Sequence, residues 1–215
     1  MYAKFSKRLF DIIICAVALV VLSPIMLIVA LAIKIESTGP VIFRQTRLGR
    51  YGKPFTIYKF RSMCTGAEGM GSGQYSFKGD PRVTKVGRII RATSIDELPQ
   101  LVNIIKGDMS LIGFRPPLTY HPMPYDEYTE EQKKMFTVRP GVTGWAQIHG
   151  RKDVMWDERI KMGVYYAENV SFLMDVRIFF VTICKVITGA DNVNTGVTAT
   201  VKTEEVKTEE TVVKQ

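Results

Sequence analysis

The sequence contains few residues that could hold a transition metal through sulfur or nitrogen. Among its 215 residues are three cysteines and two histidines. Cys15, Cys64 and Cys184 lie far apart and form no Cys-x-x-Cys pair, so the sequence supports neither a zinc site nor a disulfide framework. His121 and His149 have no metal-ligand spacing with each other or with a cysteine, and we interpret both as structural. A reduced, cytosol-facing body is the simplest interpretation.

Acidic residues are also in deficit. The chain has 29 Lys and Arg against 21 Asp and Glu, a net charge of +8. This excess indicates an anionic partner, such as nucleic acid, anionic lipid or a phosphorylated metabolite. No RNA-recognition, helix-turn-helix or zinc-finger pattern is present, which argues against nucleic acid.

The C-terminal segment lacks the residues that build a core. Residues 201–210 read VKTEEVKTEE, one polar five-residue unit written twice. Such a repeat cannot bury enough apolar surface to offset its ordering entropy, so we expect residues 191–215 to form a disordered tail. The remaining chain divides into an N-terminal anchor, residues 1–37, and a globular domain, residues 38–190.

The anchor contains a long uncharged apolar run, Ile12 to Ile33, which is long enough to cross about 30 Å of hydrocarbon. The Ser23-Pro24 pair interrupts it, and Pro24 has no N–H for the preceding turn, so we expect a kink there. Basic residues flank both ends, which favours two cytoplasmic ends over the charge asymmetry of a spanning helix. From these residues alone, a re-entrant helix and a kinked spanning helix remain equally open. A cleaved signal peptide is less favoured, because the apolar run exceeds a usual hydrophobic region.

The globular part predicts an α+β fold: a mostly helical, membrane-associated domain with a re-entrant N-terminal helix, interfacial amphipathic helices and a small β element. We expect short strands near residues 41–43 and 55–58, and a mobile glycine-rich loop over 67–80. A helix is predicted from an N-cap at Asp96 to Gly107, with a buried stripe. A second is expected over 126–138, then a turn-rich stretch, and a last helix over 175–188 that we place in the membrane interface. The predicted stripe consists of Leu98, Leu101, Val102 and Ile105.

The adjacent carboxylates of Asp96 and Glu97 are the main candidates for a reactive site. On spacing alone a structural role is simpler, with one carboxylate capping a helix and the other favouring its dipole. Nearby cations favour a second role, because guanidinium groups around a helix N-terminus bind diphosphate well. A carboxylate in such a site can hold Mg²⁺ against phosphate oxygens or attack phosphorus as a nucleophile. The cations are Lys59, Arg61, Arg82, Lys85, Arg88, Arg91 and Arg115.

Any one of these arginines is more simply explained as solvated or lipid-facing surface. Arg115 is the exception, because Phe114 and Pro116 place it in a rigid turn. A non-enzymatic scaffold for anionic lipids, with Asp96 and Glu97 as a helix cap, is therefore a competing interpretation.

Several long segments closely resemble the bacterial sugar transferase family, the monotopic phosphoglycosyl transferases that begin glycoconjugate assembly. The resemblance covers residues 6–190. It is carried by KRLFDIIICAVALVVLSPIMLIVALAIKIES, GPVIFRQTRLG, GKPFTIYKFRSM, TSIDELPQLVNIIKGDMSLIGFRPP and RPGVTGWAQIHGR. Compared with larger members, the chain lacks added N-terminal transmembrane helices and is similar to the minimal catalytic form. The VKTEE repeat is not a family feature.

The resemblance implies transfer of a phospho-sugar from a UDP-sugar to undecaprenyl phosphate, with release of UMP. It implies a re-entrant helix broken at Ser23-Pro24 and an active site on the cytoplasmic face of the bacterial inner membrane. Membrane lipids, and downstream glycosyltransferases of polysaccharide or glycoprotein glycan assembly, are then the expected partners. A glycosyltransferase that moves the sugar alone and leaves UDP is the competing enzyme.

The resemblance also implies roles for single residues. Asp96 is the expected nucleophile of a covalent aspartyl-phosphosugar intermediate and a ligand of Mg²⁺, and Glu97 is the adjoining acid/base or orienting carboxylate. Lys59, Arg61, Arg91 and Arg115 are expected at the substrate phosphates. Asp175 matches an acidic position near the active site.

Overall fold

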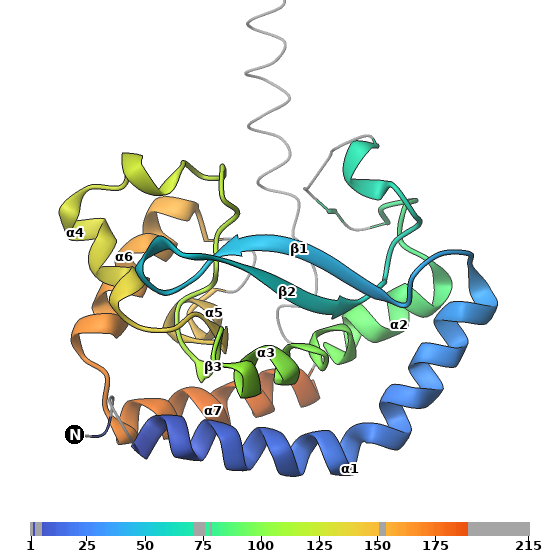
Figure 1. Ribbon diagram of the computed structural model, residues 1–215, viewed down its shortest axis with the longest axis horizontal. Coiled ribbons are helices and arrows are strands. Elements are labelled where there is room, and N and C mark those ends of the chain that lie inside the picture. Colours follow the sequence, from blue (N-terminus) through green and yellow to red (C-terminus); the bar gives the residue numbers. More distant parts are fainter. Residues whose placement is uncertain (1, 3–5, 71–75, 78, 151–153, 189–215) are drawn as a thin grey trace, which may run out of the picture.

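The computed structural model describes residues 2, 6–70, 76–77, 79–150 and 154–188 (Figure 1). The predicted tail, residues 191–215, lies outside the described residues, as does part of the predicted loop over 67–80. The elements in chain order are α1 (Lys7–Glu36), β1 (Ile42–Leu48), β2 (Pro54–Phe60), α2 (Lys85–Ala92), α3 (Gln100–Lys106), β3 (Ser110–Ile112), α4 (Glu130–Lys133), β4 (Gly141–Thr143), α5 (Trp145–Ile148), α6 (Trp156–Glu168) and α7 (Phe172–Thr188). Short 3₁₀ turns lie between several of them.

The predicted α+β class is confirmed. Strands β1 and β2 form an antiparallel hairpin, and β3 pairs with β4 in parallel. Both predicted strands exist and are longer than expected, because the hairpin continues through the polar residues that follow Phe43. Helix α7 begins three residues before the predicted start, at Phe172.

Helix α1 is one continuous helix that bends part-way along its length (Figure 1). Pro24 lies inside it, and the hydroxyl of Ser23 donates to the Val20 carbonyl at 2.8 Å. Pro24 has no N–H for that carbonyl, so the Ser23 bond supplies the missing donor. The helix therefore bends at the serine-proline pair but continues beyond it as one helix.

Both halves of α1 pack against the body of the protein. Before the bend, Cys15 joins a buried cluster with Ile57 and Ile104; after it, Val29 and Ile33 join another with Phe60 and Ile90.

Polar contacts fix the two ends of α1. The carboxylate of Asp11 is buried, and it accepts from Ser110 Oγ at 2.7 Å and from the Leu111 N–H at 3.1 Å. At the other end, the buried Arg61 guanidinium donates to the carbonyls of Ser37 and Thr38, both at 2.7 Å. Each tie satisfies groups that would otherwise be buried without a partner, so separating either end from the body is costly.

Helix α3 lies on β2 through a buried amide. Asn103 is fully buried; its Oδ1 accepts from the Tyr58 N–H at 3.0 Å, and its Nδ2 donates to the Thr56 carbonyl at 2.7 Å. The predicted buried stripe is partly wrong: Val102 and Ile105 are more than a third exposed. The prediction counted apolar residues only, whereas a polar residue occupies this buried face because it satisfies the backbone of β2.

The N-terminal boundary of α3 also differs from the prediction. Asp96 is not an N-cap; it lies in a 3₁₀ turn, Ile95–Glu97, that follows Ser94 in a left-handed conformation with φ 58°. Pro99 precedes the first residue of α3. The predicted C-terminus at Gly107 is confirmed, with φ 98°.

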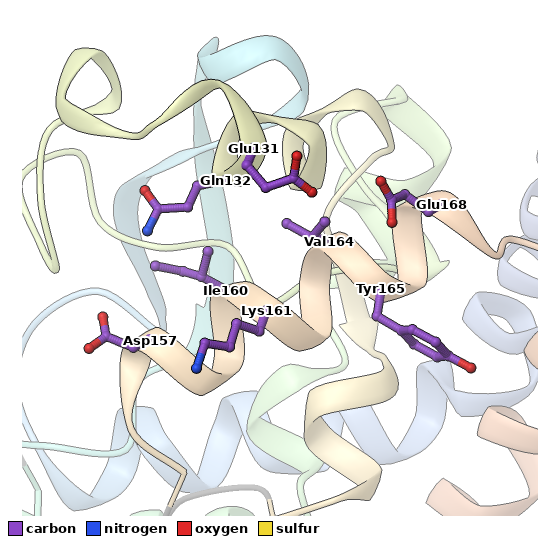
Figure 2. Close-up of a pocket in the computed structure, with 8 residues that line it drawn as sticks. All are labelled: Glu131, Gln132, Asp157, Ile160, Lys161, Val164, Tyr165 and Glu168. Carbon is purple, nitrogen blue, oxygen red and sulfur yellow. The ribbon is translucent and has the colours of Figure 1, made fainter.

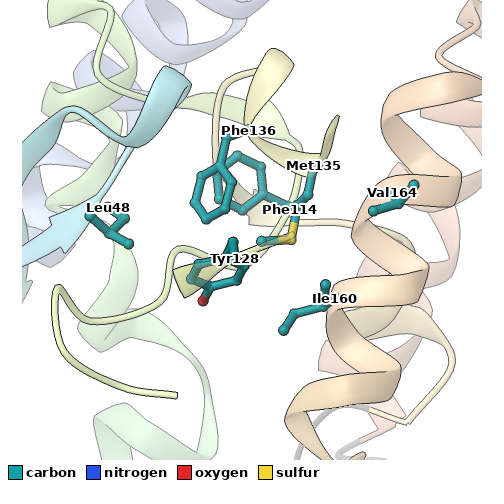
Figure 3. Close-up of a cluster of buried hydrophobic side chains, with 7 residues drawn as sticks. All are labelled: Leu48, Phe114, Tyr128, Met135, Phe136, Ile160 and Val164. Carbon is teal, nitrogen blue, oxygen red and sulfur yellow. The ribbon is translucent and has the colours of Figure 1, made fainter. Parts of the chain in front are cut away.

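The hydrophobic core beside α6 is a cluster of buried aromatic and aliphatic side chains (Figure 3). Phe136 is fully buried. Its ring packs against the rings of Phe114, Tyr125 and Tyr128, and each of these ring centroids lies 5.1 Å from that of Phe136. The single helix predicted over 126–138 is wrong, since the segment folds as α4 between two 3₁₀ turns. Thr129 starts α4 with a capping box, and the chain then turns inward so that Phe136 is buried.

Asn103→Ala should lower the free energy of unfolding by about 2–4 kcal/mol, because it leaves the Tyr58 N–H and the Thr56 carbonyl buried without partners. The measurement is the midpoint of thermal unfolding of detergent-purified protein. Asn169→Ala, which removes one exposed hydrogen bond to the Tyr165 carbonyl, is the matched control and should cost less than about 1 kcal/mol. Equal losses in the two variants would contradict the assigned role of Asn103.

Candidate active site

The two adjacent carboxylates lie where β2, α2 and α3 meet. Glu97 Oε1 accepts from Lys59 Nζ of β2 at 2.7 Å, and both side chains are about one-fifth exposed. The left-handed backbone of Ser94 turns the chain from α2 into the 3₁₀ turn that carries both acids. Lys59 and the acidic pair, 38 residues apart in sequence, are therefore brought together by the fold.

Asp96 lies in an unfavourable environment for a charged group. Burial raises the pKa of its carboxyl to about 6, against the opposing pull of Lys59 and Arg91, with the Glu97 charge raising it further. Such a carboxylate is ionised at neutral pH but poorly solvated, and it is more basic than an ordinary aspartate. Both properties suit a nucleophile or a ligand for a cation.

Arg91 closes the last turn of α2 and contributes to the field at Asp96. Its Nη2 also donates to Ser76 Oγ at 3.0 Å. The structure thus brings together three of the predicted residues around Asp96, namely Glu97, Lys59 and Arg91.

Arg115 lies in the rigid turn that the sequence indicated. The N–H of Gly141 donates to the Phe114 carbonyl, and the N–H of Leu48 to the Pro117 carbonyl, both at 2.9 Å. The pKa of Arg47 in β1 is lowered to about 10, mainly by burial and also by the nearby Arg115 guanidinium.

Arg47 and two neighbours were missed as site residues by sequence reasoning. Arg47 Nε donates to Gln45 Oε1 at 2.9 Å, and Gln45 Nε2 donates to Glu68 Oε1 at 2.5 Å. Arg47 also lies within the field of Glu97. The sequence does not single out this face, because residues 44–47 are all polar. Only the pairing with β2 shows that Gln45 and Arg47 share the face on which Lys59 lies opposite Phe43.

Other predicted residues have different contacts. Arg61 donates to the C-terminal end of α1, and its predicted contact with phosphate stays a prediction. Asp175 is buried in α7, where it pairs with Lys7 at 2.6 Å and accepts from the hydroxyls of Tyr2 and Tyr166 at 2.7 Å. These contacts fasten the start of α1, and none among the described residues joins Asp175 to Asp96.

The other cations that lie near the acidic pair in the sequence differ in their contacts. Arg82 is buried and forms an ion pair with Asp80 at 2.7 Å, which lowers the pKa of Asp80 to about 2. It also donates to the carbonyls of Ala67 and Met70, so it organises the loop before α2. Lys85 and Arg88 are exposed.

A groove of about 600 Å³ lies elsewhere, between α4 and α6 (Figure 2). Its lining includes the carboxylates of Glu131, Asp157 and Glu168, with Lys161 and no arginine. Because this acidic lining repels phosphate, the groove does not fit an anionic substrate.

Comparison with known proteins identifies the family of the chain. The model of the bacterial sugar transferase family matches residues 2–189. The chain belongs to the bacterial sugar transferase family. The matched range contains α1, the hairpin and the acidic pair.

Individual relatives agree. The chain is 43% identical over 182 residues to a Bacillus subtilis protein named uncharacterized sugar transferase EpsL, covering 84% of this chain and 87% of the relative. It is 46% identical over 188 residues to the UDP-N-acetylgalactosamine-undecaprenyl-phosphate N-acetylgalactosaminephosphotransferase of Aeromonas hydrophila, covering 86% and 44%. It is 41% identical over 187 residues to the UDP-glucose:undecaprenyl-phosphate glucose-1-phosphate transferase of Escherichia coli K12, covering 85% and 40%. The chain thus spans less than half the length of the last two relatives.

The raised pKa of Asp96 predicts a stability effect. The pKa of an unfolded aspartate is about 3.9, so between about pH 4 and 6 the folded protein keeps a proton that the unfolded chain has lost. Above about pH 6 the carboxyl is charged in both states, and the cost of burying that charge lowers the free energy of unfolding by its full amount. Asp96→Asn should therefore raise stability at pH 7.5 by about 1–2 kcal/mol, a value discounted for partial solvent exposure. The measurement is thermal unfolding in detergent with EDTA.

The gain should shrink as the pH falls through 6 and vanish only below about pH 4, where the carboxyl is protonated in both the folded and the unfolded state. The exposed Asp126→Asn is the matched control and should leave the unfolding midpoint unchanged at both pH values. A pH-independent gain in Asp96→Asn would show that charge burial is not its cause.

Proposed function

We propose that the protein transfers a sugar phosphate from a UDP-sugar to a polyprenol phosphate, with Asp96 as nucleophile and UMP as the leaving product. The observation that carries this proposal is the partly buried Asp96 carboxylate with a pKa near 6, in the field of Lys59 and Arg91. The substrate classes rest on the printed activities of the Aeromonas and Escherichia relatives.

The proposed reaction has two steps. First, a carboxylate oxygen of Asp96 bonds to the sugar-bearing phosphorus of the donor, and the bond from that phosphorus to the bridging oxygen breaks. UMP leaves with the electron pair, and an aspartyl-phosphosugar remains. Second, an oxygen of the polyprenol phosphate attacks the same phosphorus, which restores the Asp96 carboxylate and forms a polyprenyl diphosphosugar.

The surrounding cations have a physical task in both steps. Donor and acceptor are both anionic, so their approach to a carboxylate is repulsive unless positive charge offsets it. Lys59, Arg91, Arg115 and Arg47 supply that charge from β2, α2, the turn after β3 and β1. Lys59 also holds Glu97 beside Asp96, which leaves Glu97 placed to orient a substrate or exchange a proton.

Mg²⁺ fits this donor set in combination with the substrate. Among the described residues, no three His, Cys, Asp or Glu side chains gather into a metal site. Mg²⁺ in phosphate sites commonly takes one or two carboxylates and completes its shell with phosphate oxygens and water. Asp96 and Glu97 would hold it, and the ion would supply charge neutralisation at the diphosphate.

The membrane arrangement that we propose is re-entrant, with both ends of α1 on the cytoplasmic face. Within the described residues, α1 is the one helix long and apolar enough to cross a bilayer. A spanning helix would carry its ends to opposite faces, about 30 Å apart. Instead Asp11 and Arg61 hold the two ends to one body.

An outward apolar surface supports this placement. Large side chains of α1 and α7 are more than half exposed, and both helices run along the lower edge in Figure 1, where Phe10 of α1 contacts Phe172 of α7. Such an uncovered apolar surface is costly in water and suits lipid. Its members are Leu9, Ile13, Val17, Val20, Val21, Leu27, Ile28, Leu31, Ile35, Phe172, Leu173, Phe180 and Ile187.

The decisive experiment withholds the acceptor. Purified protein with Mg²⁺ and a panel of UDP-sugars should release about one UMP per protein and gain the mass of one sugar phosphate. Undecaprenyl phosphate should then discharge the adduct and allow turnover. Asp96→Asn should lose the burst, the adduct and at least about 10³-fold in turnover.

Asp126→Asn serves as the carboxylate control and should behave as the unaltered protein does. Release of UDP in place of UMP would identify a glycosyltransferase that moves the sugar alone. No nucleotide from any sugar would favour a lipid-binding scaffold, and a retained burst in Asp96→Asn would remove Asp96 as the nucleophile.

Pro24→Ala tests the membrane arrangement. It restores a backbone N–H and removes the ring that obstructs a straight helix, a change of about 3 kcal/mol in helix preference. We expect part of the population to move the N-terminus across the membrane, against the ties at Asp11 and Arg61. The measurement is labelling of Ser6→Cys by an impermeant reagent, in protein whose three cysteines are replaced by serine.

Pro124→Ala, in an exposed turn outside α1, is the control and should keep the label cytoplasmic. An unchanged location in Pro24→Ala would show that the end contacts, and not Pro24, determine the arrangement.

A further inference from the structure

A row of polar side chains extends the proposed active site along β1. It starts at Lys59, which binds Glu97 and lies across the hairpin from Phe43. Gln45 and Arg47 follow on the same face, so the row extends over the four residue steps from position 43 to 47, about 14 Å at the usual strand rise. Glu68 joins the row beside Gln45, because its Oε1 accepts from Gln45 Nε2. This row is longer than a single phosphate requires.

Charge divides the row into two parts. The part near Asp96 is cationic, with Lys59 and Arg91, and Arg47 continues it beside Arg115. The other part carries Glu68, an exposed carboxylate that lies beside Gln45. Glu68 contributes to the electrostatic field at Arg47, but within the described part of the chain it forms no direct ion pair with a Lys or Arg side chain.

We propose that Glu68, oriented by Gln45 and Arg47, is the carboxylate that recognises the hydroxyl groups of the donor's sugar. This inference rests on the proposed function. A carboxylate next to a diphosphate site repels the phosphates unless it faces a neutral, hydrogen-bond-donating part of the substrate. In a UDP-sugar that part, at the end opposite the uridine, is the sugar ring with its hydroxyl groups.

The hydrogen bonds along the row fix the geometry of Glu68. Gln45 receives a donor from Arg47 on its carbonyl oxygen, which determines that its amide nitrogen faces Glu68. Arg47 is itself held through Nη1 by the Pro116 carbonyl at 3.2 Å. Oε1 of Glu68 is therefore engaged, and among the described residues Oε2 accepts no hydrogen bond. An ionised carboxylate oxygen that is held in place and unoccupied is a strong acceptor for sugar hydroxyls.

A metal role for Glu68 is less well supported. Asp96 and Glu97 lie beside Lys59, whereas Glu68 is bonded to Gln45. Among the described residues, these acids form no common three-ligand group. The two roles differ in a measurable way. A metal ligand changes the Mg²⁺ dependence, whereas a sugar ligand changes discrimination among donors.

The test compares sugar-dependent and sugar-independent binding. The full chain is assayed with Mg²⁺, undecaprenyl phosphate and UDP-glucose, UDP-N-acetylglucosamine or UDP-N-acetylgalactosamine, and the Kd of UDP is measured separately. Glu68→Gln should lower kcat/KM for the best donor about ten-fold or more, and change its ratio to the next donor. The Kd of UDP should stay within about two-fold, because UDP has no sugar at that end.

Gln45 is a positioning residue, so Gln45→Ala should change the donor ratio in the same direction. The double variant should add little to either single change, since both act through one carboxylate. Glu130→Gln, an exposed carboxylate whose side chain is 91% accessible, is the matched control and should leave kcat/KM and the donor ratio unchanged.

Three results would overturn the inference: an equal loss of UDP affinity, a shift in the Mg²⁺ concentration for half-maximal rate, or unchanged donor ratios in Glu68→Gln. Failure of the proposed function is recognised separately, because the unaltered protein would then release UDP or no nucleotide. The comparison of Kd values for UDP-sugar and UDP remains informative in that case.

Discussion

The ties at the two ends of α1 determine where every other part of the protein lies. An apolar helix of 30 residues is 45 Å long at 1.5 Å per residue, yet its first turns and its last carbonyls bind the same body. Asp11 and Arg61 achieve this with buried charged groups, which carry a large penalty if left unpaired. Hydrophobic packing alone would permit sliding along the helix, whereas these directional bonds specify its register. The position of the proposed active site relative to α1 is therefore fixed as well.

Electrostatics at the site follows from that placement. A reaction between two phosphorylated substrates needs positive charge, and the fold assembles it from β1, β2, α2 and the turn after β3. The same burial that raises the pKa of Asp96 weakens its solvation, and Lys59 and Arg91 keep it from remaining protonated at neutral pH. The local instability of the carboxylate is thus a cost in folding that serves reactivity.

The sequence allowed several of these features to be anticipated. The kink at Ser23-Pro24 follows from the missing proline N–H, and the C-terminus of α3 follows from Gly107, because both depend on local chemistry. The predicted start of α3 was wrong, because the left-handed residue before the acidic pair is Ser94 and not glycine, the residue that usually indicates such a turn in a sequence. The buried face was misread where Asn103 replaces an apolar side chain. Arg47 was counted only as flanking charge, because its role depends on the strand register with β2, a contact that local spacing does not reveal.

The partner of Asp11 has a consequence for biosynthesis. Asp11 leaves the ribosome well before Ser110, which follows 99 residues later in the chain. Until that later segment is made, the carboxylate has none of its native hydrogen-bond donors, and an apolar environment strongly disfavours its charge. Helix α1 can therefore make its native contacts at Asp11 only after the segment that contains β3 has been synthesised. Placement of α1 and folding of the body are in this way coupled, because the Asp11 carboxylate of α1 obtains its hydrogen bonds from residues of β3.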